Sequence, residues 1–130
     1  MQNAESRMQN EAHMKYNAIV DKSFDFSCRI VHLYQYMIRE HKEYVLSKQI
    51  LRSGTSIGAN VHEAQKGQSR ADFAAKMNVA LKEANETEYW LRLLYKTEYL
   101  SEQQFFSLHR DVDELISILV AICTTAGAAK

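Results

Sequence analysis

The sequence predicts an all-α protein, an antiparallel up-down-up-down four-helix bundle, and three observations support this prediction. The chain of 130 residues contains no proline and only four glycines, so the turn residues on which β-sandwiches and barrels depend are scarce. Four segments carry apolar residues at spacings of three and four, which is the pattern of helices that bury one face. The connections between these segments are short, and short connections make neighbouring helices antiparallel.

A single domain is expected, because one hydrophobic core commonly serves about 100–150 residues. Residues 15–126 are predicted to form the bundle. Residues 1–14 are rich in Gln, Asn, Glu and Met and show no apolar periodicity, so we expect a flexible N-terminal extension. Residues 127–130 are expected to form a frayed tail.

The first helix is predicted from about Asn17 to Glu40, where two adjacent apolar seams indicate a broad buried face. One seam contains Ile19, Phe26, Ile30, Leu33 and Met37, and the other contains Val20, Phe24, Val31, Tyr34 and Ile38. The charged stretch from Arg39 to Glu43 is expected to end this helix.

The second helix is predicted from about Tyr44 to Lys66. Its seam contains Leu46, Ile50, Ser53, Ile57, Asn60 and Ala64. Gly67 follows where a helix-terminating glycine commonly adopts the left-handed conformation.

The third helix is predicted from about Arg70 to Glu98, with Ser69 as its N-cap and Asp72 placed to reach back toward that cap. Its seam contains Phe73, Met77, Ala80, Ala84, Thr87, Leu91 and Leu94. Ser101 and Gln104 have the spacing of a capping box, so they are expected to open the fourth helix. The seam of that helix contains Phe105, Leu108, Val112, Leu115, Leu119 and Ile122.

The centre of the second helix is unusually polar and small, and it contains Gly54 and Gly58. A glycine in a helix interior costs about 1 kcal/mol relative to alanine, so some other interaction must offset this cost. Because the two glycines share one stripe of the helix, we interpret them as a site of close packing with a neighbouring helix. The alternative is a phosphate-cradling loop, although no strand is predicted before them and no Gly-Lys-Ser/Thr sequence follows them.

Polar residues of the second and third helices are expected to meet. If the two helices form an antiparallel hairpin, two residues whose numbers sum to roughly 138 lie at the same height along the hairpin. The expected cluster contains Arg52, Ser56, Asn60, Glu63, Asn78 and Glu86. Arg52 would then pair with Glu86 inside the hairpin and satisfy a buried charge. We interpret the cluster as a structural network that fixes helix register, and a ligand-binding or catalytic cleft is the alternative.

The residue patterns of common catalytic and metal sites are absent, so we expect no enzyme activity, no cofactor and no bound metal. The Glu-x-x-His pattern of di-iron bundles does not occur. Cys28 with His32 and His109 with Asp113 have i,i+4 spacing, but one such pair alone is weak evidence for a metal site. No G-x-S-x-G nucleophile elbow is present.

The charge balance and hydropathy disfavour nucleic-acid-binding and membrane proteins, and a local basic strip is the alternative. The chain has 16 basic and 16 acidic residues and a formal net charge of zero, which is not the basic footprint of a nucleic-acid-binding protein. No apolar run approaches the ~20 residues of a membrane span, and the N-terminus lacks the pattern of a signal peptide. We therefore expect a cytoplasmic protein without a membrane partner.

The third helix carries further apolar residues, Tyr89, Trp90 and Leu93, outside its core seam. Exposed aromatic patches commonly mark partner interfaces, so these residues are candidates for an oligomer interface. A wider core face on the third helix is the alternative.

The stretch from Leu46 to Leu94 closely resembles the bacterial four-helix bundle proteins known as the 23S rRNA intervening-sequence family. The matching residues are Gln49, Arg52, Ser53, Ser56, Ile57, Asn60, Glu63, Ala64, Ser69, Phe73, Ala80, Glu86 and Leu91. The resemblance implies a ring-shaped homopentamer of four-helix bundles whose molecular function is largely unassigned. The chain also looks like the pentameric accessory protein of diversity-generating retroelements, which is strongly basic and associates with a reverse transcriptase and nucleic acid.

We therefore expect a non-enzymatic, self-assembling bundle that acts as a scaffold or adaptor. The alternative is an RNA- or nucleoprotein-binding accessory subunit, in which a ring gathers Lys48, Arg92 and Lys96 from several chains. A third hypothesis is an enzyme that uses the cluster of Arg52, Asn60, Glu63 and Glu86.

Overall fold

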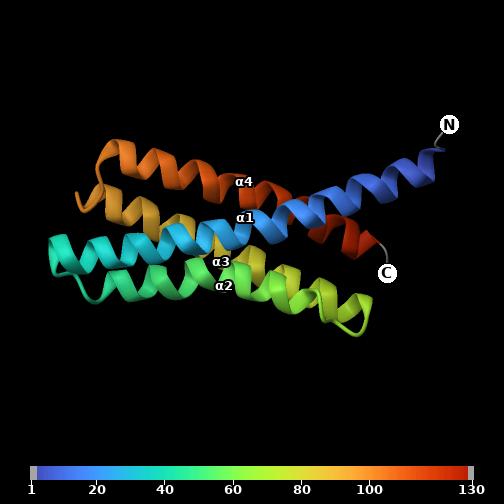
Figure 1. Cartoon of the computed structure of the whole chain (residues 1–130), viewed down its shortest axis with the longest axis horizontal. Coiled ribbons are helices and arrows are strands. Elements are labelled where there is room, and N and C mark those ends of the chain that lie inside the picture. The colour runs from blue at the N-terminus through green and yellow to red at the C-terminus, as the bar shows by residue number, and fades with distance from the viewer. Residues whose placement is uncertain (1–2, 129–130) are drawn as a thin grey trace.

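The computed structural model describes residues 3–128, which form four helices: α1 (Ala4–His41), α2 (Leu46–Ala64), α3 (Arg70–Lys96) and α4 (Glu102–Ala128). Over this range the structure contains no strand, so the all-α prediction with four helices is confirmed. In Figure 1 consecutive helices run in alternate directions along the long axis of the molecule. Each helix packs against the next along the chain, and α4 packs back against α1.

The predicted seams supply the core. The first seam of α1 and the apolar seam residues of α4 are all buried, and Ile19, Ile30, Ile57 and Leu91 are fully excluded from solvent. Burying such side chains is the main stabilising term of the fold, at roughly 1.5–3 kcal/mol each. The broad buried face expected on α1 is present only in part. Val20, Tyr34 and Ile38 of the second seam are half-buried, whereas Phe24 remains 68% exposed. α1 packs against α2 and α4, and part of its second seam lies beyond both neighbours.

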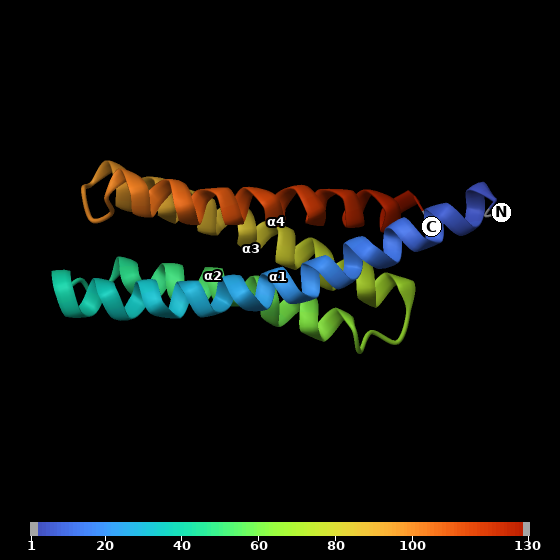
Figure 2. The same cartoon turned by 45° about the horizontal axis from the view of Figure 1, so that its top comes forward.

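α1 begins well before the predicted start near Asn17. Asn3 caps it by accepting a 2.8 Å hydrogen bond from the backbone N–H of Ser6. Residues 4–14 are helical, because the cap and the helix-favouring Ala, Glu, Gln and Met residues of this segment suffice without an apolar seam. Figure 2 shows that the beginning of α1 projects past the ends of the other helices. Residues 1 and 2 of the predicted extension lie outside the described residues.

α4 continues farther than the bundle boundary predicted at residue 126. Gly127 lies in its last turn. The last two residues of the predicted frayed tail, 129 and 130, lie outside the described residues.

The predicted caps of α3 and α4 are confirmed. The Ser69 hydroxyl accepts from the backbone N–H of Asp72 at 3.1 Å. Ser101 and Gln104 form a reciprocal capping box: each backbone N–H donates to the side chain of the other residue, at 2.8 Å and 3.1 Å. These bonds satisfy donors that a helix N-terminus leaves without partners.

The prediction of a left-handed Gly67 is wrong, since no glycine of the described chain has a positive φ. The backbone N–H groups of residues 65–67 instead donate to carbonyl groups three residues earlier, so the chain leaves α2 in a tight turn. A glycine suits this turn for space: a Cβ at this position would lie 3.2 Å from the carbonyl oxygen of Ala64 and 3.3 Å from the nitrogen of Phe73, so these backbone atoms would have to move by a few tenths of an ångström.

The connection between α1 and α2 contains a cap that was not predicted. Lys42 adopts the left-handed conformation, with φ 52°. The carboxylate of the next residue, Glu43, accepts hydrogen bonds from the backbone N–H groups of Val45, Leu46 and Ser47 at 3.0, 2.9 and 2.8 Å. Burial disfavours the charged carboxylate, but these three donors outweigh it and hold the pKa of Glu43 below its ordinary value. Glu43 therefore anchors the N-terminus of the helix that carries the polar cluster.

Replacing Glu43 by glutamine is expected to cost about 1 kcal/mol of unfolding free energy at neutral pH, the usual worth of an N-cap. Because folding lowers the pKa of Glu43, its carboxylate stabilises the fold above its ordinary pKa, and this stability is lost as the pH falls through the folded value. The difference between wild type and variant should therefore shrink below about pH 4.5. Urea unfolding at pH 7 and pH 3 measures it. The exposed Glu40→Gln is the control, and an equal difference at both pH values would contradict the prediction.

Candidate functional site

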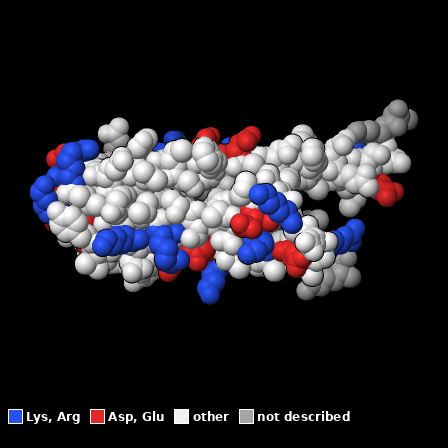
Figure 3. Space-filling model, turned by 60° about the horizontal axis from the view of Figure 1, so that its bottom comes forward, with Lys and Arg blue, Asp and Glu red and all other residues white. Residues whose placement is uncertain are grey.

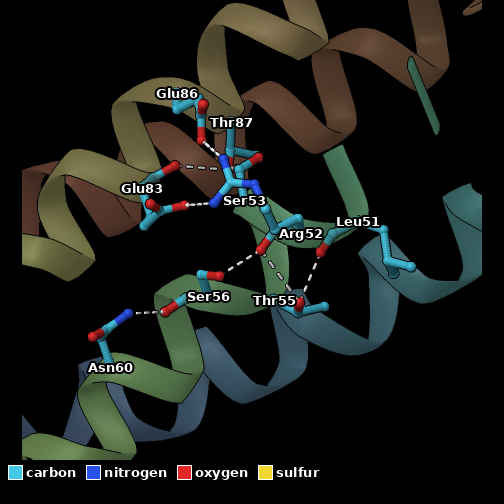
Figure 4. A network of polar contacts seen from close by, with 9 residues as sticks. All are labelled: Leu51, Arg52, Ser53, Thr55, Ser56, Asn60, Glu83, Glu86 and Thr87. Atoms are coloured by element: carbon cyan, nitrogen blue, oxygen red, sulfur yellow. Dashed lines mark hydrogen bonds and ion pairs between the residues drawn. The ribbon is translucent and has the colours of Figure 1, made fainter. Parts of the chain in front are cut away.

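Arg52 on α2 joins two glutamates of α3 (Figure 4). Its guanidinium lies 3.0 Å from the Glu83 carboxylate and also pairs with Glu86, so the structure brings Arg52 and Glu86 level as the hairpin register predicts. The hydrogen bond with Glu86 and the charges of both glutamates raise the pKa of Arg52. The two carboxylates therefore favour the charged form of Arg52.

The cluster lies at the surface rather than inside the hairpin. The Arg52 side chain is 50% exposed and that of Glu86 is 37% exposed. Exposed ion pairs of this kind contribute about 0–1 kcal/mol, so this network orients two helices more than it stabilises them. Its position on the outer face of the hairpin also gives little support to the hypothesis of an enclosed catalytic cleft.

The other members of the predicted cluster bond within their own helices. The Asn60 side chain donates to the carbonyl of Ser56 at 2.8 Å, and the Ser56 hydroxyl donates to the carbonyl of Arg52 at 2.6 Å. Asn78 likewise donates to the carbonyl of Ala74 on α3 at 2.8 Å. Glu63 is exposed near the end of α2. The structure therefore brings only the Arg52 end of the cluster together across the two helices.

A buried pair that sequence reasoning missed lies beside this network. Ser53 and Thr87 are fully buried, and their hydroxyl oxygens hydrogen-bond at 2.9 Å across the α2–α3 contact. The Thr87 hydroxyl also lies 2.8 Å from the carbonyl of Glu83. Both residues belong to the predicted core seams, and their numbers fit the hairpin register. Each seam contains one of these polar residues, and the hairpin register puts them at the same height along the two helices. This coincidence was the signal that could have identified the pair.

Gly54 and Gly58 lie where α1 crosses α2. A Cβ at Gly54 would lie 2.7 Å from Cγ1 of Ile30, a side chain that is fully buried. A Cβ at Gly58 would lie 3.0 Å from Oγ of Ser27 and 3.1 Å from the carbonyl oxygen of Ser23. These glycines leave room for the α1 backbone and side chains, which is the arrangement expected of close helix packing.

The aromatic residues of α3 form an apolar surface. Tyr89 is 54% exposed and packs edge-on against Trp90, with ring centroids 5.2 Å apart. Trp90 and Leu93 are half-buried. The indole nitrogen of Trp90 is buried without a hydrogen-bond partner among the residues that the structure describes. A buried donor without an acceptor costs about 1–3 kcal/mol, so this tryptophan is held by its packing.

A groove of about 370 Å³ runs between this surface and α4. Tyr89 and Leu93 line one side, and Phe105, which stacks on Tyr95 at 4.4 Å between ring centroids, forms part of its floor. Arg92 and Lys96, two of the candidate nucleic-acid contacts, also line it. The candidate interface and two of the candidate basic contacts therefore belong to one surface.

Charges of both signs surround this groove. Arg92 lies 3.7 Å from Glu88, and His109 lies between the carboxylates of Glu88 at 3.0 Å and Asp113 at 3.3 Å. Lys48 is exposed on α2. On the face seen in Figure 3 basic side chains gather toward the left end, and basic and acidic side chains alternate toward the right.

Residues 3–128 contain no group of three or more His, Cys, Asp and Glu side chains arranged to hold a metal ion. Cys28 and Cys123 are free thiols. None of the helices within these residues has the length and apolarity needed to cross a membrane.

Comparison with known proteins gives one family. Residues 15–121 match the model of the 23S rRNA-intervening sequence protein family. A similar solved structure is that of a protein with unknown function from the S23 ribosomal protein family of Bacteroides thetaiotaomicron. Its sequence identity is 56% and its TM-score 0.83, over 85% of this chain and 98% of that one. No curated protein matches the chain. The family match spans all of α2 and α3, including the surfaces described above.

Proposed function

Because the chain belongs to the 23S rRNA-intervening sequence protein family, we propose that it is a non-enzymatic, self-assembling four-helix bundle of the antiparallel up-down-up-down type. It forms a homopentameric ring and acts as a scaffold or adaptor. The observation that carries this proposal is the apolar surface of α3, where Tyr89 is 54% exposed beside Leu93. Aromatic surfaces of this kind are typical of protein–protein interfaces.

A closed ring of identical chains requires two different surfaces on each chain, because every contact joins one face of a protomer to another face of its neighbour. α1 supplies a second apolar surface: Phe24 is 68% exposed and Val31 is 38% exposed. α1 and α3 each pack against α2 and α4, so they occupy opposite corners of the bundle. They meet where Tyr16 of α1 and Phe73 of α3 lie with ring centroids 5.6 Å apart. The two apolar surfaces therefore lie on different sides of the protomer, as a ring requires.

The test is the mass of the assembly in solution, measured by light scattering after size exclusion. We expect Tyr89→Glu combined with Leu93→Glu to lower this mass five-fold, because each variant chain introduces two charges into the apolar contact. Phe24→Glu should have the same effect from the opposite surface. Val45→Glu is the matched control, since Val45 is 70% exposed but lies at the α1–α2 connection. A wild-type chain with the 15.0 kDa mass of one protomer at high concentration would refute the proposal.

RNA or nucleoprotein binding is the second candidate function. It is favoured by Arg92 and Lys96, which border a groove that also contains Tyr89, because basic groups beside aromatic rings can hold phosphates and stacked bases. A ring would repeat these groups, together with Lys48, around its circumference. Retention of single-stranded RNA at low salt, lost when these three residues become glutamate, would favour this function over a scaffold role. No retention by the wild-type assembly would exclude it.

A further inference from the structure

The projecting start of α1 leaves part of a helix surface without a partner. A groove of about 500 Å³ lies between this segment and the last turns of α4, and it is lined mainly by apolar side chains. Met8 and Ala12 lie on its α1 side, and Ile122 and Ala126 lie on its α4 side. Met8 is 68% exposed.

Met8, Ala12 and Lys15 line this groove and continue the core stripe of α1, and Glu5 lies one step farther along the same stripe. Glu5, Met8, Ala12, Lys15 and Ile19 follow one another at spacings of three, four, three and four, the heptad pattern of two packed helices. Ile19 is fully buried in the bundle, whereas the four earlier residues are exposed. The segment therefore carries half of a helix–helix contact that no other part of the described chain completes.

The order of large, small and charged side chains along this stripe is complementary to itself in the antiparallel direction, which identifies its binding partner. If two copies of α1 pair antiparallel about residue 10, Met8 of one copy faces Ala12 of the other, and Glu5 faces Lys15. Every contact occurs twice, as a two-fold interface requires. The central layers are then a large apolar residue against a small one, and opposite charges flank them on both sides. A parallel pairing would instead place Glu5 against Glu5 and Lys15 against Lys15.

From this geometry we propose that the first turns of α1 bind the same segment of a second copy, antiparallel and end to end, in the groove beside α4. The second bundle then lies beyond the N-terminus of the first, where Figure 2 shows no other helix. The small side chain of Ala126 lets the incoming helix approach α4. Glu5, Met8 and Ala12 precede residues 15–121 that match the family model, so this contact belongs to the chain's own extension.

The pairing does not depend on the ring. A single protomer would form a dimer and a ring would form a double ring, so the loss of the pairing halves the mass in either case. Loss of the ring contact instead lowers the mass five-fold, and it is caused by substitutions at other residues, Tyr89, Leu93 and Phe24. The two proposals therefore fail independently.

The experiment is a charge exchange in the full chain, again read by light scattering after size exclusion. Glu5→Lys alone places two lysines in each flanking layer, and Lys15→Glu alone places two glutamates there. Each single variant is expected to weaken the pairing by about ten-fold or more and to halve the mass, because like charges are brought together. The double variant restores opposite charges in the same layers and should recover the wild-type mass.

Asn10→Lys is the matched control. Residue 10 lies two positions from both Met8 and Ala12, so it points to the opposite face of the helix and its charge should leave the mass unchanged. Circular dichroism should show equal helix content in all variants, since these positions are exposed. Unchanged mass in both single variants would overturn the proposal. A halved mass that the double variant does not restore would also overturn it, because a different protein would then be the partner of this surface.

Discussion

The Gly54→Leu variant is expected to lose about 3 kcal/mol of unfolding free energy, the largest loss among the substitutions considered. A Cβ at position 54 would lie 2.7, 2.9 and 3.0 Å from three carbons of Ile30, and Ile30 has no exposed surface into which it could move. Overpacking a tight helix contact commonly costs about 1–3 kcal/mol, and leucine adds three further carbons beyond Cβ. Denaturation in urea at constant pH measures the loss.

Two further variants test the cause. Gly54→Leu combined with Ile30→Ala should be more stable than Gly54→Leu alone, because the smaller residue makes room for the larger one. Gly127→Ala is the matched control, since nothing lies within 4 Å of the position a Cβ would take there. It should change the stability by less than about 0.5 kcal/mol. If Gly54→Ala instead stabilised the protein by about 1 kcal/mol, as for an unconstrained helical glycine, close packing would be the wrong explanation.

Arg52 and Ser53 show what the sequence could and could not predict about the candidate site. The hairpin register gives the height of each residue along α2 and α3, so it correctly placed Arg52 level with Glu86. Height does not give the rotation of a helix about its own axis, and neighbouring residues point about 100° apart. Ser53 therefore lies in the core against Thr87, while Arg52 lies at the surface.

The start of α1 shows the limit of apolar periodicity as a signal. That signal identifies helices that bury a face in the same chain, so it located the bundle and its four core seams. Residues 4–14 bury little, yet they are helical because Asn3 caps them and nothing in their composition breaks a helix. Glu43 was missed for a related reason: a carboxylate that caps three backbone N–H groups looks, in sequence, like one more charge in a charged connection.

Replacing Thr87 by valine is expected to cost about 2 kcal/mol, because the change keeps the shape of the side chain but removes a buried hydroxyl. The Ser53 hydroxyl loses the partner 2.9 Å away and stays fully buried, and an unsatisfied buried group costs about 1–3 kcal/mol. Urea denaturation provides the measurement. Thr125→Val is the matched control, since Thr125 is an exposed helical threonine whose hydroxyl donates only to the carbonyl of Ala121 on its own helix.

The double variant Ser53→Ala/Thr87→Val separates a true pair from two independent hydroxyl groups. Removing both hydroxyl groups leaves no unsatisfied buried group. The double variant should therefore lose about 1 kcal/mol less unfolding free energy than the two single variants lose together. Additive losses would mean that each hydroxyl is satisfied within its own helix and that the pair does not couple α2 to α3. Thr87 lies two residues before Tyr89, so this coupling also sets the register of the α3 surface on which the proposed ring depends. The assembly mass of Thr87→Val, measured alongside its stability, shows whether that surface needs the pair.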